Sequence, residues 1–228
     1  MRTIEEPALN SHRVVVFTRT LGYRHESIES AVALLVRMGE AQGWTVCPTE
    51  NPDELSSLLP DADTVVFAST SGEVLTSEAR DLLVEHVSRG GGFAGVHAAA
   101  CTEYAWPYYG RLVGARFAGH PPYQRGTVLV EDQDHPATEH LPRVWDFEDE
   151  WYDFDVSPRA HVRVLASADE STYAGGGMGH DHPLAWCHDS CGGRVFYTAL
   201  GHAVEAYADP DFQAHLMGGL RYTLGLAG

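Results

Sequence analysis

The sequence predicts an α/β fold in which helices cover both faces of a parallel sheet. Two observations carry this prediction. In the first half of the chain, short β-branched apolar runs alternate with longer segments of helical periodicity. In the second half, residues 106–193 are rich in His, Trp, Tyr, Asp and Pro and contain further strand-like runs. This change of character predicts a partly antiparallel extension of the same domain, which would roof the functional site.

The expected strands of the first half are short and apolar, as in sheets that are buried on both faces. They cover residues 13–18, 44–48, 63–68 and 93–97. Helices are expected between them, over residues 27–42, 52–59 and 77–89. Gly43 would end the first of these helices, and Thr76 would cap the third. Right-handed crossovers then make the sheet parallel. Later strands are expected at 126–130, 162–166, 183–187 and 194–200, and a last helix at 209–224.

Length and composition narrow the class of protein. A chain of 228 residues fits one domain, which we place at residues 1–228. The formal net charge of −17 disfavours nucleic acids and anionic membranes as partners, because both would be repelled. No apolar run reaches the roughly 20 residues of a membrane span, and residues 1–12 do not read as a signal peptide. We therefore expect a cytoplasmic protein, with its four cysteines reduced.

Histidines stand where predicted strands end. His25, His97 and His202 follow three such strands, and His120 lies in a Gly-His-Pro-Pro loop. Ligands of α/β sheets bind beyond the carboxyl ends of the strands, so these side chains are expected to meet there. Imidazoles with a carboxylate are typical zinc ligands. We expect the four histidines to bind a divalent metal, zinc first, or His97, His202 and Glu150 to act in acid–base catalysis.

Aromatic residues are dense in residues 104–109 and 145–154, with carboxylates between them. Aromatic rings stack on the apolar faces of sugars, while Asp, Glu and Arg bind the hydroxyls, so a small carbohydrate is the expected substrate. Ordinary core packing is the alternative for each ring. The expected substrate-binding residues are Tyr23, Arg24, Ser71, Trp106, Tyr109 and Trp151.

The turn at Gly95-Val96-His97 resembles the strand-to-helix elbow that presents a nucleophile in other α/β enzymes, in the pattern Gly-x-(Cys or Ser)-x-Gly. Here the elbow position holds a histidine, and Cys101 comes four residues later. Covalent acyl chemistry is therefore disfavoured, and a glutaminase is not expected.

The other histidines divide into two groups. His180 and His182 form a His-x-His pair in a glycine-rich loop, where a lid contact or weak metal binding is the expectation. Four more are expected on the surfaces of helices or loops, namely His86, His140, His161 and His215.

Several motifs in a fixed order resemble one known family. They are GYRHESI at residues 22–28, GFAGVHAA at 92–99, DEWY at 149–152 and the segments 106–109, 113–117, 134–136, 182–186 and 193–202. Together they resemble the ThuA-like (trehalose-utilisation) family over nearly the whole chain. The resemblance implies a class I glutamine amidotransferase-like fold, flavodoxin-like in outline, without the amidotransferase cysteine. It also implies that His202 stands at the amidotransferase histidine position, with Glu205 as its partner.

Two functions remain open at this point. The resemblance implies sugar catabolism, with family members associated with trehalose and with oxidoreductases that make 3-keto sugars. The first function is therefore an enzyme of lyase or hydrolase type acting on a disaccharide or keto-glycoside, in which a metal polarises a ketone. The second is a non-catalytic sugar-binding or regulatory protein that has lost the nucleophile. No nucleotide cofactor is expected, and a homodimer is expected on general grounds.

Overall fold

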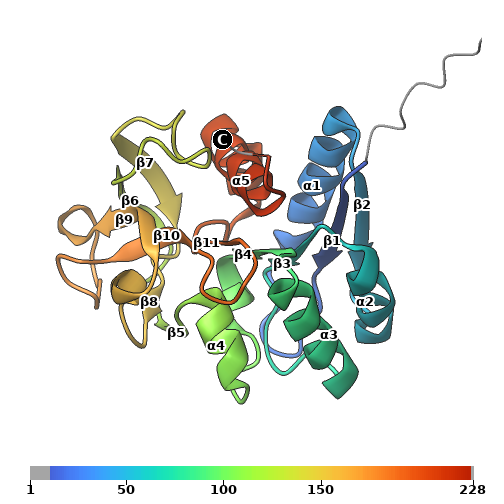
Figure 1. The fold of residues 1–228 in the computed structure, drawn as a ribbon. Coiled ribbons are helices and arrows are strands. Elements are labelled where there is room, and N and C mark those ends of the chain that lie inside the picture. The colour runs from blue at the N-terminus through green and yellow to red at the C-terminus, as the bar shows by residue number, and fades with distance from the viewer. Residues whose placement is uncertain (1–10, 227–228) are drawn as a thin grey trace, which may run out of the picture.

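The computed structural model describes residues 11–226, and its centre is a nine-stranded sheet in the order β2-β1-β3-β4-β11-β10-β9-β6-β7 (Figure 1). The parallel half contains β2 (Thr45–Thr49), β1 (Arg13–Phe17), β3 (Thr64–Ala68), β4 (Gly92–Val96) and β11 (Val195–Thr198). The antiparallel half contains β10 (Pro183–His188), β9 (Arg163–Asp169), β6 (Gln124–Val130) and β7 (Val144–Asp149). The predicted α/β fold with an antiparallel extension is confirmed.

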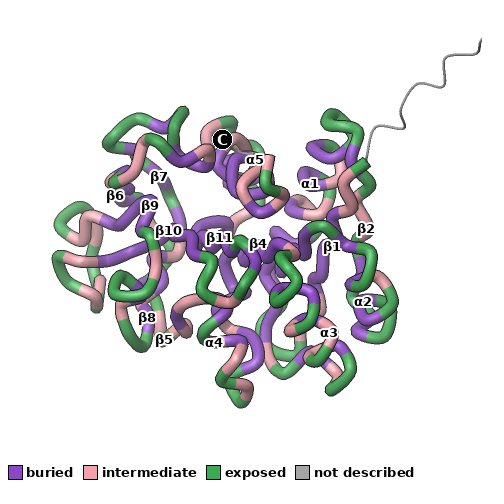
Figure 2. The backbone as a smooth tube through the Cα atoms, viewed as in Figure 1, coloured by how far each residue is buried: buried purple, intermediate pink, exposed green. Residues whose placement is uncertain are grey.

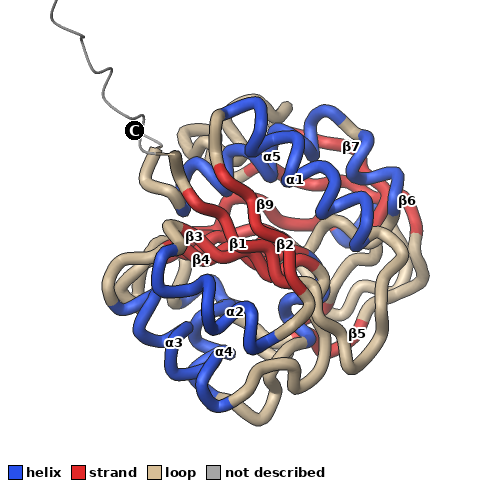
Figure 3. The backbone as a smooth tube through the Cα atoms, turned by 90° about the vertical axis from the view of Figure 1, so that its right-hand side faces the viewer, coloured by secondary structure: helices blue, strands red, loops and turns tan. Residues whose placement is uncertain are grey.

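Helices cover both faces of this sheet. Figures 1 and 3 show α1 (Ile28–Gln42) and α5 (Pro210–Thr223) on one face, with α2 (Pro52–Leu58), α3 (Ser77–Ser88) and α4 (Pro107–Val113) on the other. Every residue of β3, β4 and β11 is buried between these layers, and Figure 2 shows the same for the middle of the sheet. This explains why their sequences are continuous apolar runs rather than alternating ones. Among residues 11–226, every helix is too short or too polar to serve as a membrane span.

Strand β11 joins the two halves of the sheet. It pairs in parallel with β4, where Tyr197 lies opposite Gly95, and antiparallel with β10, where Tyr197 lies opposite Trp186. The last strand of the chain therefore lies in the interior of the sheet. Its carboxyl end opens at the same edge as those of β1 and β4, because all three strands run parallel.

Four elements were not predicted from the sequence. They are α4, β7, β5 (Phe117–Gly119) and β8 (Asp153–Phe154), the last two forming a separate two-stranded sheet. Helix α4 has only seven residues, so its helical periodicity is short. Strand β7 reads Val-Trp-Asp-Phe-Glu-Asp and alternates exposed and buried positions along its length. Its aromatic and acidic residues indicated a sugar site, whereas Trp145 and Phe147 pack in the core.

Two of the histidines expected on the surface are instead buried. His86 and His215 are 0% and 1% exposed. His86 Nε2 donates to the carbonyl of Gly92 at 2.9 Å, and His215 Nδ1 donates to the carbonyl of Ala137 at 2.7 Å. The expectation was wrong for these two because a hydrogen bond to a main-chain carbonyl offsets the free-energy cost of burying a neutral imidazole. His140 and His161 are exposed, as expected.

Buried neutral histidines make the fold sensitive to acid. Burial lowers the pKa of both His135 and His215 to about 4, with the charge of Arg163 adding to the effect at His135. In an unfolded chain a histidine binds its proton near pH 6.5, so the unfolded state holds more protons than the native state between about pH 6.5 and 4. Stability therefore falls as the pH falls through this window, by up to about 1.4 kcal/mol per pH unit for each residue.

Urea unfolding measured between about pH 7 and 4.5 tests this prediction. His215→Leu should reduce the slope by the contribution of one proton, while Val156→Ala, at an exposed position with no titratable group, should leave the slope unchanged. A free energy of unfolding that stays level across the window would contradict the expectation.

Candidate functional site

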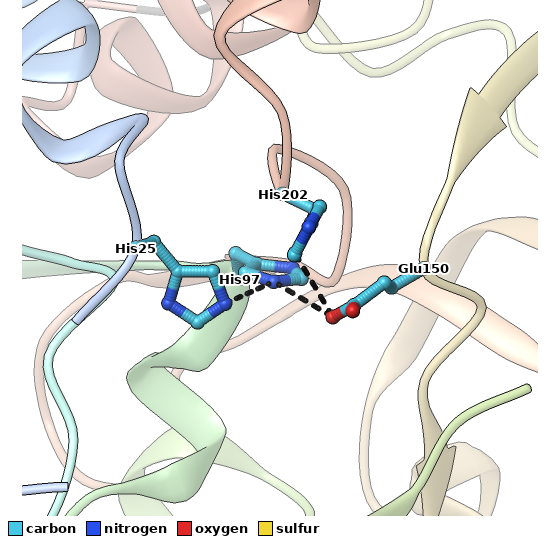
Figure 4. Close-up of side chains that lie close together, drawn as sticks. All are labelled: His25, His97, Glu150 and His202. Carbon is cyan, nitrogen blue, oxygen red and sulfur yellow. Dashed lines mark hydrogen bonds and ion pairs between the residues drawn. The ribbon is translucent and has the colours of Figure 1, made fainter. Parts of the chain in front are cut away.

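Four side chains gather at the carboxyl edge of the parallel strands (Figure 4). His25 follows β1, His97 follows β4 directly, and His202 follows β11. Glu150 comes from the segment after β7, at the far end of the sheet order. Each offers one nitrogen or oxygen atom, and these four atoms lie within 4.8 Å of one another. We call these four residues the donor cluster.

His97 lies at the centre of the donor cluster and is fully buried. Its backbone is left-handed, with φ of 50°, which turns the side chain sharply at the end of β4. Its Nδ1 donates to the carbonyl oxygen of Ala199 at 2.7 Å, so the lone pair of the neutral ring is on Nε2. That Nε2 lies 3.1 Å from His25 Nε2, 2.9 Å from Tyr152 Oη and 3.7 Å from Glu150 Oε2.

A buried carboxylate holds His202 and Glu150 in place. Asp149 is 0% exposed and accepts hydrogen bonds from the backbone N–H groups of Glu150 (2.8 Å), Gly201 (2.7 Å) and His202 (3.1 Å). Gly201 has φ of 114°, a conformation that favours glycine. The end of β7 is thereby tied to the exit of β11. The result brings His202 Nδ1 within 2.9 Å of Glu150 Oε2.

The partner of His202 is therefore Glu150 and not Glu205, which the family resemblance had suggested. Glu205 is exposed and lies in the single-turn 3-10 helix Val204–Ala208. The acid comes instead from the antiparallel extension, which the sequence alone did not place relative to β11.

The charges of the donor cluster suit a metal ion. Burial lowers the pKa of His25 to about 3, and repulsion from the protonated forms of His97 and His202 adds to this effect. His25 is therefore neutral at neutral pH. Burial acts to raise the pKa of Glu150, but the imidazoles of His202 and His97 beside it outweigh burial and lower that pKa, so Glu150 is ionised. Burial acts to lower the pKa of His202, but the hydrogen bond to Glu150 raises it. Metal binding to this pair would release a proton.

The geometry also fits a zinc-type ion. Two nitrogens on a tetrahedral zinc, each at about 2.0–2.1 Å, lie roughly 3.3 Å apart, and the separation of 3.1 Å between His25 Nε2 and His97 Nε2 is close to this value. The hydrogen bond from His97 to Ala199 is of the kind that orients a metal-binding histidine. His25 Nδ1 is buried and has no hydrogen-bond partner among the described residues. The donor cluster could therefore hold a divalent metal.

His120 was expected among the metal ligands, and the structure places it outside the donor cluster. Its Nδ1 donates to the carbonyl of Pro121 at 2.8 Å, and its Nε2 lies 3.6 Å from Glu150 Oε1. The ring is one-third exposed, at 34% of its side-chain area. His120 therefore lies next to the donor cluster and faces Glu150 Oε1, whereas His202 faces Glu150 Oε2.

A cavity of about 700 Å³ opens beside the donor cluster. His25, His120 and Glu150 form its polar wall. The rest of its lining is mainly aromatic and apolar, from Ala98, Cys101, Tyr104, Phe117 and Tyr152. Tyr23 and Ser71, both expected to bind substrate, also line it, with Ser71 Oγ donating to the carbonyl of Tyr23 at 2.7 Å. The space and its lining are suited to a sugar ring.

The remaining expected substrate-binding residues do not line this cavity. Arg24 pairs with Glu50 at 2.7 Å. Tyr109 and Trp151 are both 0% exposed, and their polar atoms donate to main-chain carbonyls. Trp106 packs against the core beneath Arg80, whose guanidinium lies 5.5 Å from the ring centre. All three rings therefore contribute to the packing of the core.

Tyr152 and Asp149 are site residues whose roles the sequence did not reveal. Tyr152 Oη donates to His97 Nε2 and its ring stands in the cavity wall. Asp149 follows Trp145 and Phe147 at a spacing of two along β7, and all three are buried. An acid on the buried face of a strand is a signal of function, because burial of an unpaired carboxylate is costly. Recognition of β7 as a strand would have exposed that signal.

The two members of the His-x-His pair lie in different environments. His180 is exposed, whereas His182 is fully buried. His182 Nε2 donates to the carbonyl of Tyr152 at 2.8 Å, and Nδ1 lies 2.8 Å from Glu170 Oε1. His182 therefore holds the backbone that carries Tyr152.

A second group of potential metal ligands, Asp153, Glu170 and His182, surrounds this contact. Its carboxylates already accept from the glycine-rich loop, Asp153 from Gly177 N at 3.0 Å and Glu170 from Met178 N at 2.8 Å. Backbone donors facing these oxygens indicate a loop anchor rather than a cation site.

Fold and site together define an α/β protein whose histidines gather at the carboxyl edge of the parallel strands. A family model described as ThuA, trehalose utilisation, matches residues 13–223, and the chain belongs to this family. The resemblance seen in the sequence motifs is thereby confirmed. No curated protein matches the chain.

Solved structures share the fold. A ThuA-like protein from Bacteroides uniformis superposes with a TM-score of 0.80 at 22% identity, covering 96% of this chain and 94% of that one. A ThuA-like protein from Parabacteroides merdae gives 0.78 at 21% identity, covering 95% and 91%. A β-galactosidase from Bacillus circulans gives 0.56 at 14% identity, covering 95% of this chain but 31% of that one. At these identities the likeness establishes the fold alone.

Proposed function

We propose that the protein is an enzyme of carbohydrate breakdown that acts on a disaccharide or keto-glycoside. It uses a divalent metal, with zinc as the first candidate, which is held by His25, His97, Glu150 and His202. The observation that carries this proposal is the donor cluster itself, with four ligand atoms within 4.8 Å at the wall of a cavity of about 700 Å³. The ThuA family supplies the link to sugars.

A divalent metal bound there supplies a Lewis acid for a sugar carbonyl. The chain supplies the rest. Its aromatic wall orients the sugar ring and excludes water from one face. For loss of a group β to the carbonyl, a base must take the proton from the carbon between them, and an acid must protonate the departing oxygen. His120 and Tyr152 both line the cavity, and we assign these transfers to His120 Nε2 and the Tyr152 hydroxyl.

Cysteine chemistry does not compete with this proposal. Cys101 lies in the 3-10 helix His97–Cys101 at the cavity wall, and burial raises the pKa of its thiol to about 12. A thiol in that state is a weak nucleophile at neutral pH. This supports the view that the protein is not a glutaminase.

A non-catalytic sugar-binding protein is the second candidate. The observation that favours it is the elbow itself, where His97 stands in the position of a nucleophile. An aromatic cavity would retain sugars with no chemistry at all. Cytoplasmic location and a homodimer remain predictions under either function.

Metal analysis combined with turnover distinguishes the two functions. We expect about one metal ion per chain, cleavage of 3-keto-trehalose by the purified protein, loss of cleavage on treatment with a chelator and its return with Zn²⁺. The matched control is the same chelator treatment of Glu148→Gln, an exposed acid on β7 that should behave as the unchanged protein. Tight sugar binding without turnover, in metal-loaded protein, would favour the second function, and cleavage that survives chelation would remove the metal from the proposal.

A further inference from the structure

A second cavity, of about 370 Å³, adjoins the donor cluster. It shares Tyr23 and His25 with the larger cavity described above. The rest of its wall includes Glu26, Tyr123 and Glu205, none of which the proposed reaction uses. We call this space the acidic cavity and the larger one the aromatic cavity.

The donor cluster forms the partition between the two cavities. His25 lines both, His202 lines the acidic cavity, and Glu150 lines the aromatic cavity. His202 Nδ1 and Glu150 Oε2 are only 2.9 Å apart, so the two spaces meet across a single ion pair. A molecule that reacts at the donor cluster can therefore extend into both cavities at once. The reacting bond would lie over the partition, with one unit on either side.

The two cavities differ in chemistry. The aromatic cavity offers ring faces from Tyr104, Phe117 and Tyr152. The acidic cavity offers two carboxylates, Glu26 and Glu205, and no arginine or lysine among residues 11–226 lines it. Carboxylates accept hydrogen bonds from sugar hydroxyls, whereas they repel a phosphate or a carboxylate on the ligand. Tyr123 lines the same cavity and adds a hydroxyl group that can donate a hydrogen bond.

We infer that the acidic cavity is a subsite for a neutral, hydroxyl-rich second unit of the substrate, and that Glu205, Glu26 and Tyr123 select it. The substrate is then an unphosphorylated two-unit glycoside, with one ring against the aromatic wall and the other between the carboxylates. This inference rests on the proposed function, since it takes the donor cluster as the reacting centre.

Calorimetric titration with glucose, trehalose and trehalose 6-phosphate tests the inference. We expect trehalose to bind at least about 10-fold more tightly than glucose, because hydrogen bonds to charged groups of the second subsite contribute about that much. Trehalose 6-phosphate should bind at least about 10-fold more weakly than trehalose, since the phosphate meets two carboxylates.

The variants Glu205→Gln and Tyr123→Phe should remove most of the advantage of trehalose while leaving the affinity for glucose unchanged. The control is Glu40→Gln, an exposed acid at the other end of α1. In the double variant Glu26→Gln/Glu205→Gln the gap between trehalose and its 6-phosphate should narrow.

Three results would overturn the inference. The first is equal affinity for glucose and trehalose in the unchanged protein, and the second is tighter binding of the 6-phosphate than of trehalose. The third is loss of glucose and trehalose affinity in equal measure in Glu205→Gln. Each of these results would be compatible with a sugar-binding protein and with the proposed function. Absence of binding by all three sugars would instead count against the proposed function, and the subsite would fall with it.

Discussion

His97→Asn is expected to lower the affinity of the protein for Zn²⁺ by more than about 100-fold and to reduce turnover to background. His97 Nε2 faces His25, Glu150 and Tyr152 at 2.9–3.7 Å, so its removal takes the central donor from the cluster. Loss of a residue that merely orients a ligand costs about 10- to 100-fold in metal affinity, and loss of a ligand itself costs more. Asparagine is chosen because it tolerates the left-handed backbone at this position, where φ is 50°.

Competition with a chromophoric chelator gives the affinity, and thermal unfolding of the metal-free protein shows whether the variant folds. His161→Asn serves as the control, because that side chain is exposed and lies away from the donor cluster. A folded His97→Asn variant that binds Zn²⁺ as tightly as the unchanged protein would rule out the donor cluster as the metal site.

Asp149→Ala is expected to destabilise the protein by about 3 kcal/mol or more. The substitution leaves three backbone N–H groups, those of Glu150, Gly201 and His202, without their acceptor. Hydrogen bonds to a charged group contribute about 1.5–3 kcal/mol each, so the gross loss exceeds the expected net value. Part of it is offset, because the buried carboxylate itself is costly: burial raises the pKa of Asp149.

Asp146→Ala provides a matched comparison on the same strand. Asp146 faces solvent, so its loss should change the free energy of unfolding by no more than about 0.5 kcal/mol. Asp149→Asn, which keeps one acceptor oxygen, should fall between the two. Urea denaturation measures all three. Equal destabilisation by Asp149→Ala and Asp146→Ala would show that Asp149 does not hold the site together.

The strand exits were predictable because each parallel strand carries its own signal. Residues 13–17 and 64–68 are continuous apolar runs, and parallel strands place their carboxyl ends at one edge. That reasoning was enough to predict that His25, His97 and His202 would meet. They meet at one edge because their three strands run in the same direction.

The sequence alone could not show that Glu150 joins these histidines, and the reason is physical. Glu150 reaches the cluster through the antiparallel half, whose position depends on long-range pairings such as Phe93 of β4 with Val195 of β11 and Thr127 of β6 with Asp169 of β9. No periodicity records which strands pair at such distances along the chain. The burial of the aromatic residues depends on the same long-range packing, since composition alone did not reveal that the rings of Tyr109 and Trp151 lie in the core.

The interior position of β11 also determines when, during synthesis of the chain, the sheet and the donor cluster can form. A growing chain makes β4 and β10 before β11, so both strands expose a free edge until residues 195–198 emerge. Such edges are open to pairing with other chains, and folding that waits for distant contacts is slow. His202 emerges after β11. A nascent chain that stops short of this point lacks both the strand that unites the sheet and the last donor of the cluster, so the site is completed only after residue 202 has been synthesised.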